Sequence, residues 1–214
     1  MSSAGPSSTV ILVHGLWMSG LELSMLQHRL HSEHGFEVVS YSYRSITGTM
    51  LDHVRGLREL AQAQKTEQLH FVGHSLGGIV IFELLESTAD LAPGRAVLLG
   101  SPLQGSCAVE GIAKWPMGRA LVGHAVRDQV LSRPTRKWDG RRDIGIIAGD
   151  LSVGMGRFFA NLTSANDGTV LVEETRLEGA KDQLVMPVSH TGMVFSSDVA
   201  VQVAHFLRDG KFAP

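Results

Sequence analysis

Short, continuously apolar runs alternate with helical segments along most of this chain. Strands that are apolar at every position are typical of a parallel sheet covered by helices on both faces, because a sheet with one wetted face alternates apolar and polar residues. The predicted strands are 10–13, 36–43, 69–73, 96–101, 144–149 and 183–188. The predicted helices are 21–35, 50–65, 79–87 and 196–210. We therefore predict an α/β fold with a doubly wound, mostly parallel sheet of about six strands and helices on both faces.

The size and composition of the chain are those of one folded unit. It has 214 residues, of which 43% are hydrophobic, and no long linker, charge block or repeat interrupts it. We expect residues 10–214 to form a single domain that follows a flexible tail, the small polar residues 1–9. The formal net charge of −2 gives no overall attraction to nucleic acid. A basic cluster at 132–142 is more typical of a solvated helix end or loop than of a surface that binds anions.

Membrane insertion and disulfide bonds are not expected. No segment approaches the roughly 20 apolar residues that span a bilayer, and residues 1–9 lack the basic start and apolar core of a secretory signal. Cys107 is the only cysteine, so no intramolecular disulfide can form. We expect a cytoplasmic protein, although a processed, exported form would have the same composition. Nothing in the sequence indicates the oligomeric state.

The stretch VGHSLGG at 72–78 places Ser75 between a predicted strand and a buried helix. By itself a Gly-x-Ser-x-Gly pattern is a weak signal in a chain with 24 glycines. A sharp strand-to-helix reversal strains the serine backbone, and Gly73 and Gly77 lack the Cβ atoms that would clash. The helix that follows offers unpaired N–H groups and the positive end of its dipole, which favour developing negative charge. We therefore predict that Ser75 is a nucleophile rather than a turn residue.

A serine hydroxyl is a poor nucleophile until a base removes its proton, and ten histidines compete for that role. His190 lies in a loop directly after the last predicted strand, so it is expected at the same sheet edge as Ser75. His205 lies within the amphipathic last helix, where a packing or surface role is more typical. His190 is the predicted base.

The spacing of His28, His31 and His34 invites a metal-binding interpretation. On a helix, however, the third lies off the face of the first two, and no neighbouring Cys or Asp completes a ligand set. We predict no metal site and no cofactor.

The imidazole of such a base is oriented by a carboxylate that falls between serine and histidine in the chain. Asp150 follows the strand 144–149 immediately, at the expected edge, but its carboxylate could equally cap the loop. Asp167 lies in the turn-forming stretch NDGTV, which fixes the direction of its carboxylate. The residues favour Asp167 and leave Asp150 open.

A tetrahedral intermediate also needs hydrogen-bond donors for its oxyanion. We predict the backbone N–H of Leu76 as one donor and that of Leu16 as the other, with Trp17 as the alternative in the loop HGLWMSG. Apolar residues in loops at the same edge predict an acyl pocket, although each could equally be core. They are Trp17, Met18, Leu103, Leu171 and Met193, with Trp115 in the overlying segment.

Together these motifs resemble the α/β-hydrolase fold, specifically its small lipase/esterase branch. The resemblance covers nearly all of the chain from Val10 and depends on VHGLW, GHSLGG, LGSPLQGS, NDGTV and SHTG. The order of serine, acid and histidine matches the family, and the family's Asp-Gly-x-Val acid loop supports Asp167. The strands that usually precede the oxyanion loop are missing, so a trimmed version of the fold is implied. The segment 107–142 is too short for a large separate cap but leaves room for helices over the site.

The resemblance implies a serine hydrolase that cleaves esters and leaves the substrate open. From the apolar residues at the site edge we predict a small-molecule carboxylic ester with a short or medium acyl chain, and no cofactor. The same triad could serve a thioesterase, an amidase or an acyltransferase, and no residue distinguishes these. A catalytically silent binding protein of hydrolase fold is a different alternative, against which the complete set of Ser75, Asp167 and His190 argues. Lipid association through an amphipathic lid at 111–130 is a further alternative, but the helical periodicity there is weak.

Overall fold

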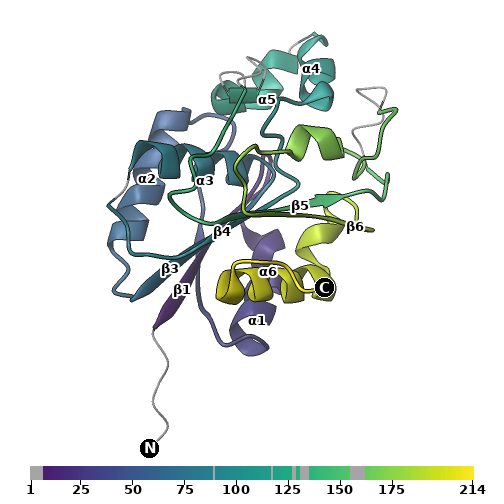
Figure 1. Ribbon diagram of the computed structural model, residues 1–214. Helices are drawn as coiled ribbons and strands as arrows, with labels where there is room; N and C mark the ends of the chain where they lie inside the picture. The colour runs from purple at the N-terminus through teal and green to yellow at the C-terminus, as the bar shows by residue number, and fades with distance from the viewer. Residues whose placement is uncertain (1–6, 89, 117, 127–128, 131–134, 155–161) are drawn as a thin grey trace, which may run out of the picture.

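A six-stranded, wholly parallel sheet forms the centre of the described part of the protein (Figure 1). The computed structural model describes residues 7–88, 90–116, 118–126, 129–130, 135–154 and 162–214. The strand order is β2-β1-β3-β4-β5-β6, and every neighbouring pair is parallel. The strands are β1 (Ser8–Val13), β2 (Glu37–Tyr41), β3 (Gln68–His74), β4 (Ala96–Leu99), β5 (Ile144–Gly149) and β6 (Asp182–Met186). The predicted fold class is therefore confirmed.

Helices cover both faces of this sheet, as Figure 1 shows. Side chains of β1 alternate between the two cores: Val10 and Leu12 pack with one pair of helices, and Ile11 and Val13 with the other. All four are fully buried, so the strand is an unbroken apolar run in the sequence. The first pair is α1 (Ser24–Ser32) and α6 (Ser197–Asp209), and the second is α2 (Met50–Gln62) and α3 (Leu76–Ser87).

Helix α3 starts one residue after the end of β3 and is buried around most of its circumference. Its first turn packs directly on the end of β1: a Cβ atom at Gly77 would lie 2.2 Å from the backbone oxygen of Val13. Only glycine permits this approach, which brings the β3–α3 corner beside the loop that follows β1.

Two short helices, α4 (Cys107–Ala113) and α5 (Gly118–Val126), lie beyond the sheet at the top of Figure 1. They occupy part of the segment for which the sequence left room for helices. No helix among the described residues is long and apolar enough to cross a bilayer. At the other end of the chain, Ser8 and Thr9 belong to β1 rather than to the predicted tail, and residues 1–6 lie outside the described ranges.

Candidate active site

Ser75 is the single residue that joins β3 to α3, and its backbone is strained. Its φ of 56° and ψ of −123° lie in a region that side-chain-bearing residues rarely adopt. Among the described non-glycine residues, only Trp17, with φ 60°, shares a positive φ. The Ser75 N–H donates to the backbone oxygen of Leu99 at 2.8 Å, and the Ser75 oxygen accepts from the N–H of Gly78 at 3.0 Å. The corner is therefore fixed from both sides.

His190 and Asp167 form a hydrogen-bonded pair. The Nδ1 of His190 lies 2.7 Å from Oδ2 of Asp167, and the His190 N–H donates to the Asp167 backbone oxygen at 2.8 Å. The other carboxylate oxygen, Oδ1, accepts from the N–H groups of Thr169 at 2.9 Å and Val170 at 2.7 Å. Asp167 is 1% exposed, so its direction is set by these contacts rather than by solvent. The ring donates through Nδ1, which leaves Nε2 as the nitrogen that can accept a proton.

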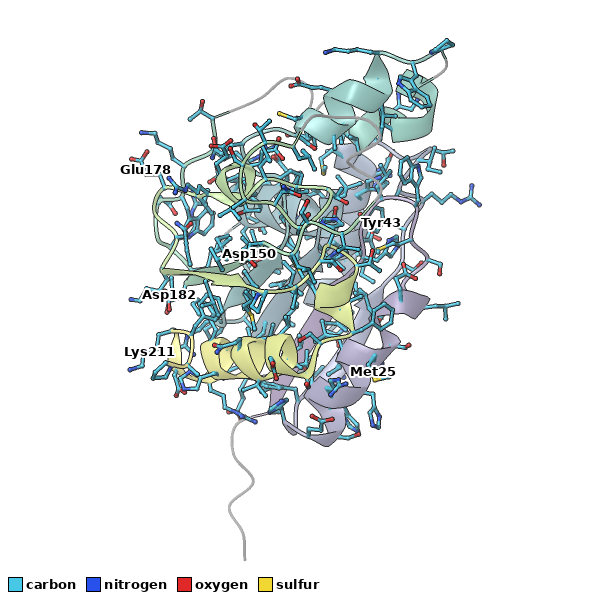
Figure 2. The ribbon with its side chains drawn as sticks, turned by 90° about the vertical axis from the view of Figure 1, so that its right-hand side faces the viewer. Met25, Tyr43, Asp150, Glu178, Asp182 and Lys211 are labelled. Carbon is cyan, nitrogen blue, oxygen red and sulfur yellow. The ribbon has the colours of Figure 1, made fainter. Side chains whose placement is uncertain are left out.

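Asp150 is placed differently. It directly follows β5, where Figure 2 labels it, its side chain is exposed, and its N–H donates to the backbone oxygen of Met186 at 3.1 Å. Among the described residues no hydrogen bond joins its carboxylate to His190. The ring partner of His190 in this structure is Asp167. His205 lies in α6, where its ring contacts the backbone oxygen of Lys211 at 2.9 Å and the carboxylate of Asp209 at 3.5 Å.

Gly100, directly after β4, lies against the hydrogen-bonded pair of Asp167 and His190. Its φ is +54°, and a Cβ atom there would lie 3.1 Å from Oδ2 of Asp167 and 3.2 Å from Nδ1 of His190. A side chain at this position would be strained and would press on the hydrogen bond between the two groups. The motif LGSP was recognised in the sequence, but not this role for its glycine.

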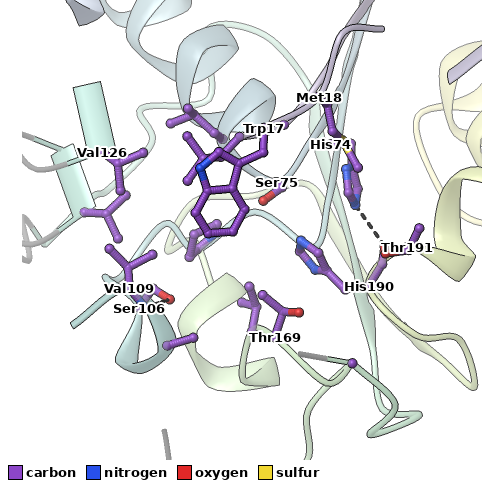
Figure 3. Close-up of a pocket in the computed structure, with 18 of the residues that line it drawn as sticks. Trp17, Met18, His74, Ser75, Ser106, Val109, Val126, Thr169, His190 and Thr191 are labelled. Atoms are coloured by element: carbon purple, nitrogen blue, oxygen red, sulfur yellow. Dashed lines mark hydrogen bonds between the residues drawn. The ribbon is translucent and has the colours of Figure 1, made fainter. Parts of the chain in front are cut away.

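Ser75 and His190 line one pocket of about 340 Å³. Figure 3 shows the indole of Trp17, the hydroxyl of Ser75 and the ring of His190 around the same space. None of the described lining residues is Asp, Glu, Lys or Arg. The Ser75 hydroxyl has no hydrogen-bond partner among the described residues, as is common for catalytic contacts before a substrate binds.

Two backbone N–H groups beside Ser75 are available to a ligand. Neither the amide of Leu16 nor that of Leu76 donates to an acceptor among the described residues, and both residues line the pocket. The amide of Leu76 is the first of α3, so it has no partner within the helix. The amide of Trp17, by contrast, donates to Oγ of Ser45 at 3.2 Å. Of the two alternatives that the loop offered, Leu16 is the one whose N–H remains available.

The predicted pocket residues divide into two groups. Trp17 and Met18 line the pocket. Leu103, Leu171 and Met193 do not: each is at least nine-tenths buried, and Leu103 and Met193 belong to the two hydrophobic cores. Trp115 is 56% exposed and also lies outside the lining. A loop residue at the sheet edge can point into the core or into the pocket, and the sequence does not specify which.

The walls that the sequence did not identify come mainly from α3, α4 and α5. They are apolar and are contributed by Ile79, Val109, Ile112, Val126 and Val130. Glu174 anchors α4 near the site, because its buried carboxylate accepts from the N–H of Cys107 at 2.6 Å and that of Leu171 at 2.9 Å. Burial raises the pKa of this carboxyl above its usual value.

One histidine of the series His28, His31 and His34, and two arginines of the basic cluster 132–142, make structural hydrogen bonds. The described residues contain no group of three or more side chains that could hold a metal ion. His31 contacts the backbone oxygen of Phe36 at 3.0 Å. In the basic cluster, of which 132–134 lie outside the described residues, Arg136 is buried rather than solvated and donates to the backbone oxygen of Leu103 at 2.9 Å. Arg142 donates to the backbone oxygens of Leu69 and Ala92.

Solved structures with the same fold include several esterases and lipases. The mature form of Bacillus licheniformis lipase BlEst2 has a TM-score of 0.73 and 20% identity, over 96% of this chain and 92% of that one. A lipase-esterase related protein from Clostridium acetobutylicum has a TM-score of 0.61 and 11% identity, over 96% and 95%. Carboxylesterase CesB from Bacillus subtilis has a TM-score of 0.59 and 12% identity, over 98% and 86%.

No curated protein matches this sequence significantly. A family model described as "Alpha/beta hydrolase family" matches residues 10–208. This match covers the sheet except for the first two residues of β1, includes every residue of the site described above, and confirms the resemblance seen in the motifs. The chain therefore belongs to the alpha/beta hydrolase family.

Proposed function

We propose that this protein hydrolyses carboxylic esters through an acyl-enzyme on Ser75. The observation that carries the proposal is the contact of 2.7 Å between His190 and the buried carboxylate of Asp167, at a pocket that also contains the strained Ser75. Nucleophile, base and orienting group have this arrangement in serine hydrolases of unrelated folds.

The first half of the reaction acylates the serine. The Nε2 of His190 accepts the hydroxyl proton of Ser75 while the serine oxygen attacks the ester carbonyl carbon. The carbonyl oxygen becomes an oxyanion, and the N–H groups of Leu16 and Leu76 donate to it. When the intermediate collapses, the bond to the alcohol oxygen breaks, and His190 gives its proton to the departing alcohol.

The second half releases the acid. His190 removes a proton from water, the hydroxide oxygen attacks the acyl carbon, and the same two N–H groups hold the second oxyanion. Collapse returns the proton to the oxygen of Ser75 and frees the carboxylic acid. Throughout, Asp167 keeps the proton of the ring on Nδ1 and stabilises the imidazolium when it forms.

The pocket favours an uncharged acyl group of short or medium length. Its walls are mainly apolar, and none of its described lining residues carries a formal charge. Burying a charged group there would leave that group without a partner, at a cost of several kcal/mol. A volume of about 340 Å³ lies at the small end of the range of ligand sites in proteins, which suits a small ester rather than a large one.

Structural neighbours described as lipases and carboxylesterases support the same class of reaction. The identity of these two proteins to this chain is 20% and 12%, so they show only that the fold is shared. The ester as substrate is inferred from the site itself.

A panel of p-nitrophenyl esters, from acetate to palmitate, tests the proposal. We expect turnover of the shorter esters by the native protein, none by Ser75→Ala, and covalent labelling of Ser75 by a fluorophosphonate probe. Equivalent thioesters, anilides and an added alcohol acceptor separate an esterase from a thioesterase, an amidase or an acyltransferase. Folded native protein that neither turns over any acyl substrate nor reacts with the probe would contradict the proposal and favour a binding role.

A further inference from the structure

A segment that follows β2 holds the loop after β1 through side-chain hydrogen bonds. The N–H of Tyr43 donates to Nε2 of His14 at 3.2 Å, and the Tyr43 hydroxyl donates to the His14 backbone oxygen at 2.8 Å. The ring of Tyr43 also stacks on that of His14, with centroids 4.4 Å apart. Two residues later, Oγ of Ser45 accepts the N–H of Trp17. This loop carries the amide of Leu16, the predicted oxyanion donor.

The contact from Ser45 falls at the most strained point of that loop. Trp17 has a φ of 60°, a left-handed conformation that a bulky residue adopts only when its surroundings enforce it. The accepting hydroxyl belongs to a side chain that is only 5% exposed. Because the Ser45 oxygen is buried, breaking this hydrogen bond would cost that oxygen a donor, so the bond restrains the Trp17 amide.

The restraint on Trp17 bears on the neighbouring amide. Ser45 holds the peptide between Leu16 and Trp17 through its N–H, so it fixes the chain on the C-terminal side of Leu16. The N–H of Leu16, in the preceding peptide, has no acceptor among the described residues, and Leu16 lines the pocket. Trp17 and Ser75, the two non-glycine residues of positive φ in the described chain, thus flank the same reaction site.

We propose that Ser45 is a positioning residue for the oxyanion site: its hydroxyl holds Trp17 in the left-handed conformation and so aims the Leu16 N–H at the substrate oxygen. Tyr43 secures the start of the same loop. Burial raises the pKa of the Tyr43 hydroxyl, so this group stays protonated and remains a donor to His14. The inference depends on the proposed ester hydrolysis, because it concerns the stabilisation of the anion that this reaction forms.

A purely structural role for Ser45 would have different kinetic effects. If Ser45 only gave the Trp17 amide an acceptor, its loss would lower the stability of the fold and leave kcat of the folded fraction unchanged. If it only placed the indole of Trp17 as a pocket wall, its loss would raise KM at constant kcat. Aiming an oxyanion donor instead affects the transition state and therefore lowers kcat.

The test compares Ser45→Ala with the native protein on one p-nitrophenyl ester. We expect kcat to fall about 10- to 100-fold, by comparison with the loss of a whole oxyanion donor, and KM to change by less than about threefold. The midpoint of the pH–rate profile should stay at the native value, because Asp167 and His190 are untouched. The rate of fluorophosphonate labelling of Ser75 should fall by a factor similar to the fall in kcat. The phosphonate oxygen of the adduct accepts from the same N–H groups as the oxyanion of the ester reaction.

Two further variants sharpen the comparison. Ser45→Thr keeps the hydroxyl and should retain most of the native kcat. Ser40→Ala is the matched control, because Ser40 lies in β2 with an exposed side chain whose hydroxyl donates to Gln27 at 3.0 Å, away from the pocket. It should have native kcat and KM. If Ser45→Ala does not fold, Tyr43→Phe, which removes only the hydroxyl, is measured in its place and should lower kcat about threefold to tenfold.

Native kcat in the folded Ser45→Ala protein would overturn the inference, and so would a rise in KM alone or a shifted pH midpoint. Native kcat in Tyr43→Phe would overturn it where that variant is the one measured. A result against the proposed ester hydrolysis can be distinguished from a result against the role of Ser45. In the first case the native protein itself would lack both ester turnover and labelling of Ser75.

Discussion

The ring of His74 donates a hydrogen bond through Nε2 to the backbone oxygen of His190 at 2.9 Å, drawn as the dashed line in Figure 3. A carbonyl oxygen can only accept, so Nε2 carries the proton of this ring, and Nδ1 is a buried nitrogen without a hydrogen-bond partner among the described residues. Burial lowers the pKa of His74 to about 3, so the ring is neutral near pH 7. Because His74 directly precedes Ser75, this bond ties the nucleophile corner to the loop of the predicted base.

Replacing His74 tests that connection. His74→Leu leaves the His190 oxygen unpaired, which should lower the free energy of unfolding by about 1–3 kcal/mol and displace the base, so that kcat falls. His74→Gln can place an amide N–H near the position of Nε2 and should retain more of both quantities. The measurements are urea unfolding and kcat on a p-nitrophenyl ester.

The pH–rate profile provides the control for this pair of variants. His74 does not titrate near neutral pH, so both variants should keep the native midpoint. A midpoint that moves in His74→Gln would show that His74 itself exchanges a proton in the reaction, contrary to the tautomer inferred here.

The acid is tested by two aspartate variants of the same kind. Asp167→Asn puts an amide against Nδ1 of His190 and favours the tautomer with the proton on Nε2, where it cannot accept from Ser75. By analogy with the same change in another Ser-His-Asp triad, kcat should fall about 10⁴-fold. Asp150→Asn is the matched control, since Asp150 is exposed and makes no contact with the ring, and it should keep native activity. The reverse pattern would assign the acid to Asp150.

The strands and the buried helix could be predicted because burial on two faces leaves a strong signal in the sequence. All six predicted strands are present, and α3 is buried around most of its circumference, as its composition indicated. Short helices near the pocket leave a weaker signal. α4 and α5 have seven and nine residues, and Gly123 breaks the helical geometry of α5 with a φ of 76°. Too few turns remain for a clear helical period.

The residues that meet at the pocket were easier to predict than the walls and supports of the pocket. Ser75 and His190 lie in motifs that follow strands, and Asp167 lies in a motif of the β5–β6 connection; parallel strands bring such segments to one edge of the sheet. Ser45 and Tyr43 belong to no such motif, and the motifs that contain His74 and His190 do not reveal the hydrogen bond between these two residues. Such contacts join segments far apart in the chain, for example Trp17 and Ser45, which are 28 positions apart.

Filling the pocket should change which esters are accepted. Val126 is 2% exposed and lines the pocket, so Val126→Phe should shorten the longest acyl chain that is turned over. Ile112→Ala, on the neighbouring helix α4, should lengthen it. Val201→Phe is the control, because Val201 lies on the exposed side of α6. The measurement is kcat/KM along the ester series, and an unchanged profile in both pocket variants would place the acyl chain elsewhere.

Acid should destabilise the fold through its buried histidines, and His70 allows this effect to be isolated. His70 is 1% exposed and its Nδ1 accepts the N–H of Arg95 at 3.0 Å, while its Nε2 is buried and has no partner in the part of the chain that the structure describes. Burial, followed by the positive charges of Arg95 and Arg142, lowers its pKa from 6.5 to about 4. Between these two values the unfolded chain binds a proton that the folded protein does not. The stabilising contribution of neutral His70 is therefore complete above about pH 6.5 and is lost as the pH falls toward about 4.

The variant His70→Asn keeps an acceptor for Arg95 in a side chain that does not titrate. The native free energy of unfolding should fall faster with acid than that of the variant, at a rate that differs by up to about 1.4 kcal/mol per pH unit. Between about pH 7 and about pH 4.5, the difference between the two proteins should therefore shift by about 2 kcal/mol in favour of the variant. Urea unfolding at several pH values measures this shift. If the free energies of unfolding of the two proteins changed with pH in parallel, the pKa of His70 would be the same in the folded and unfolded states. Burial would then not keep this ring neutral.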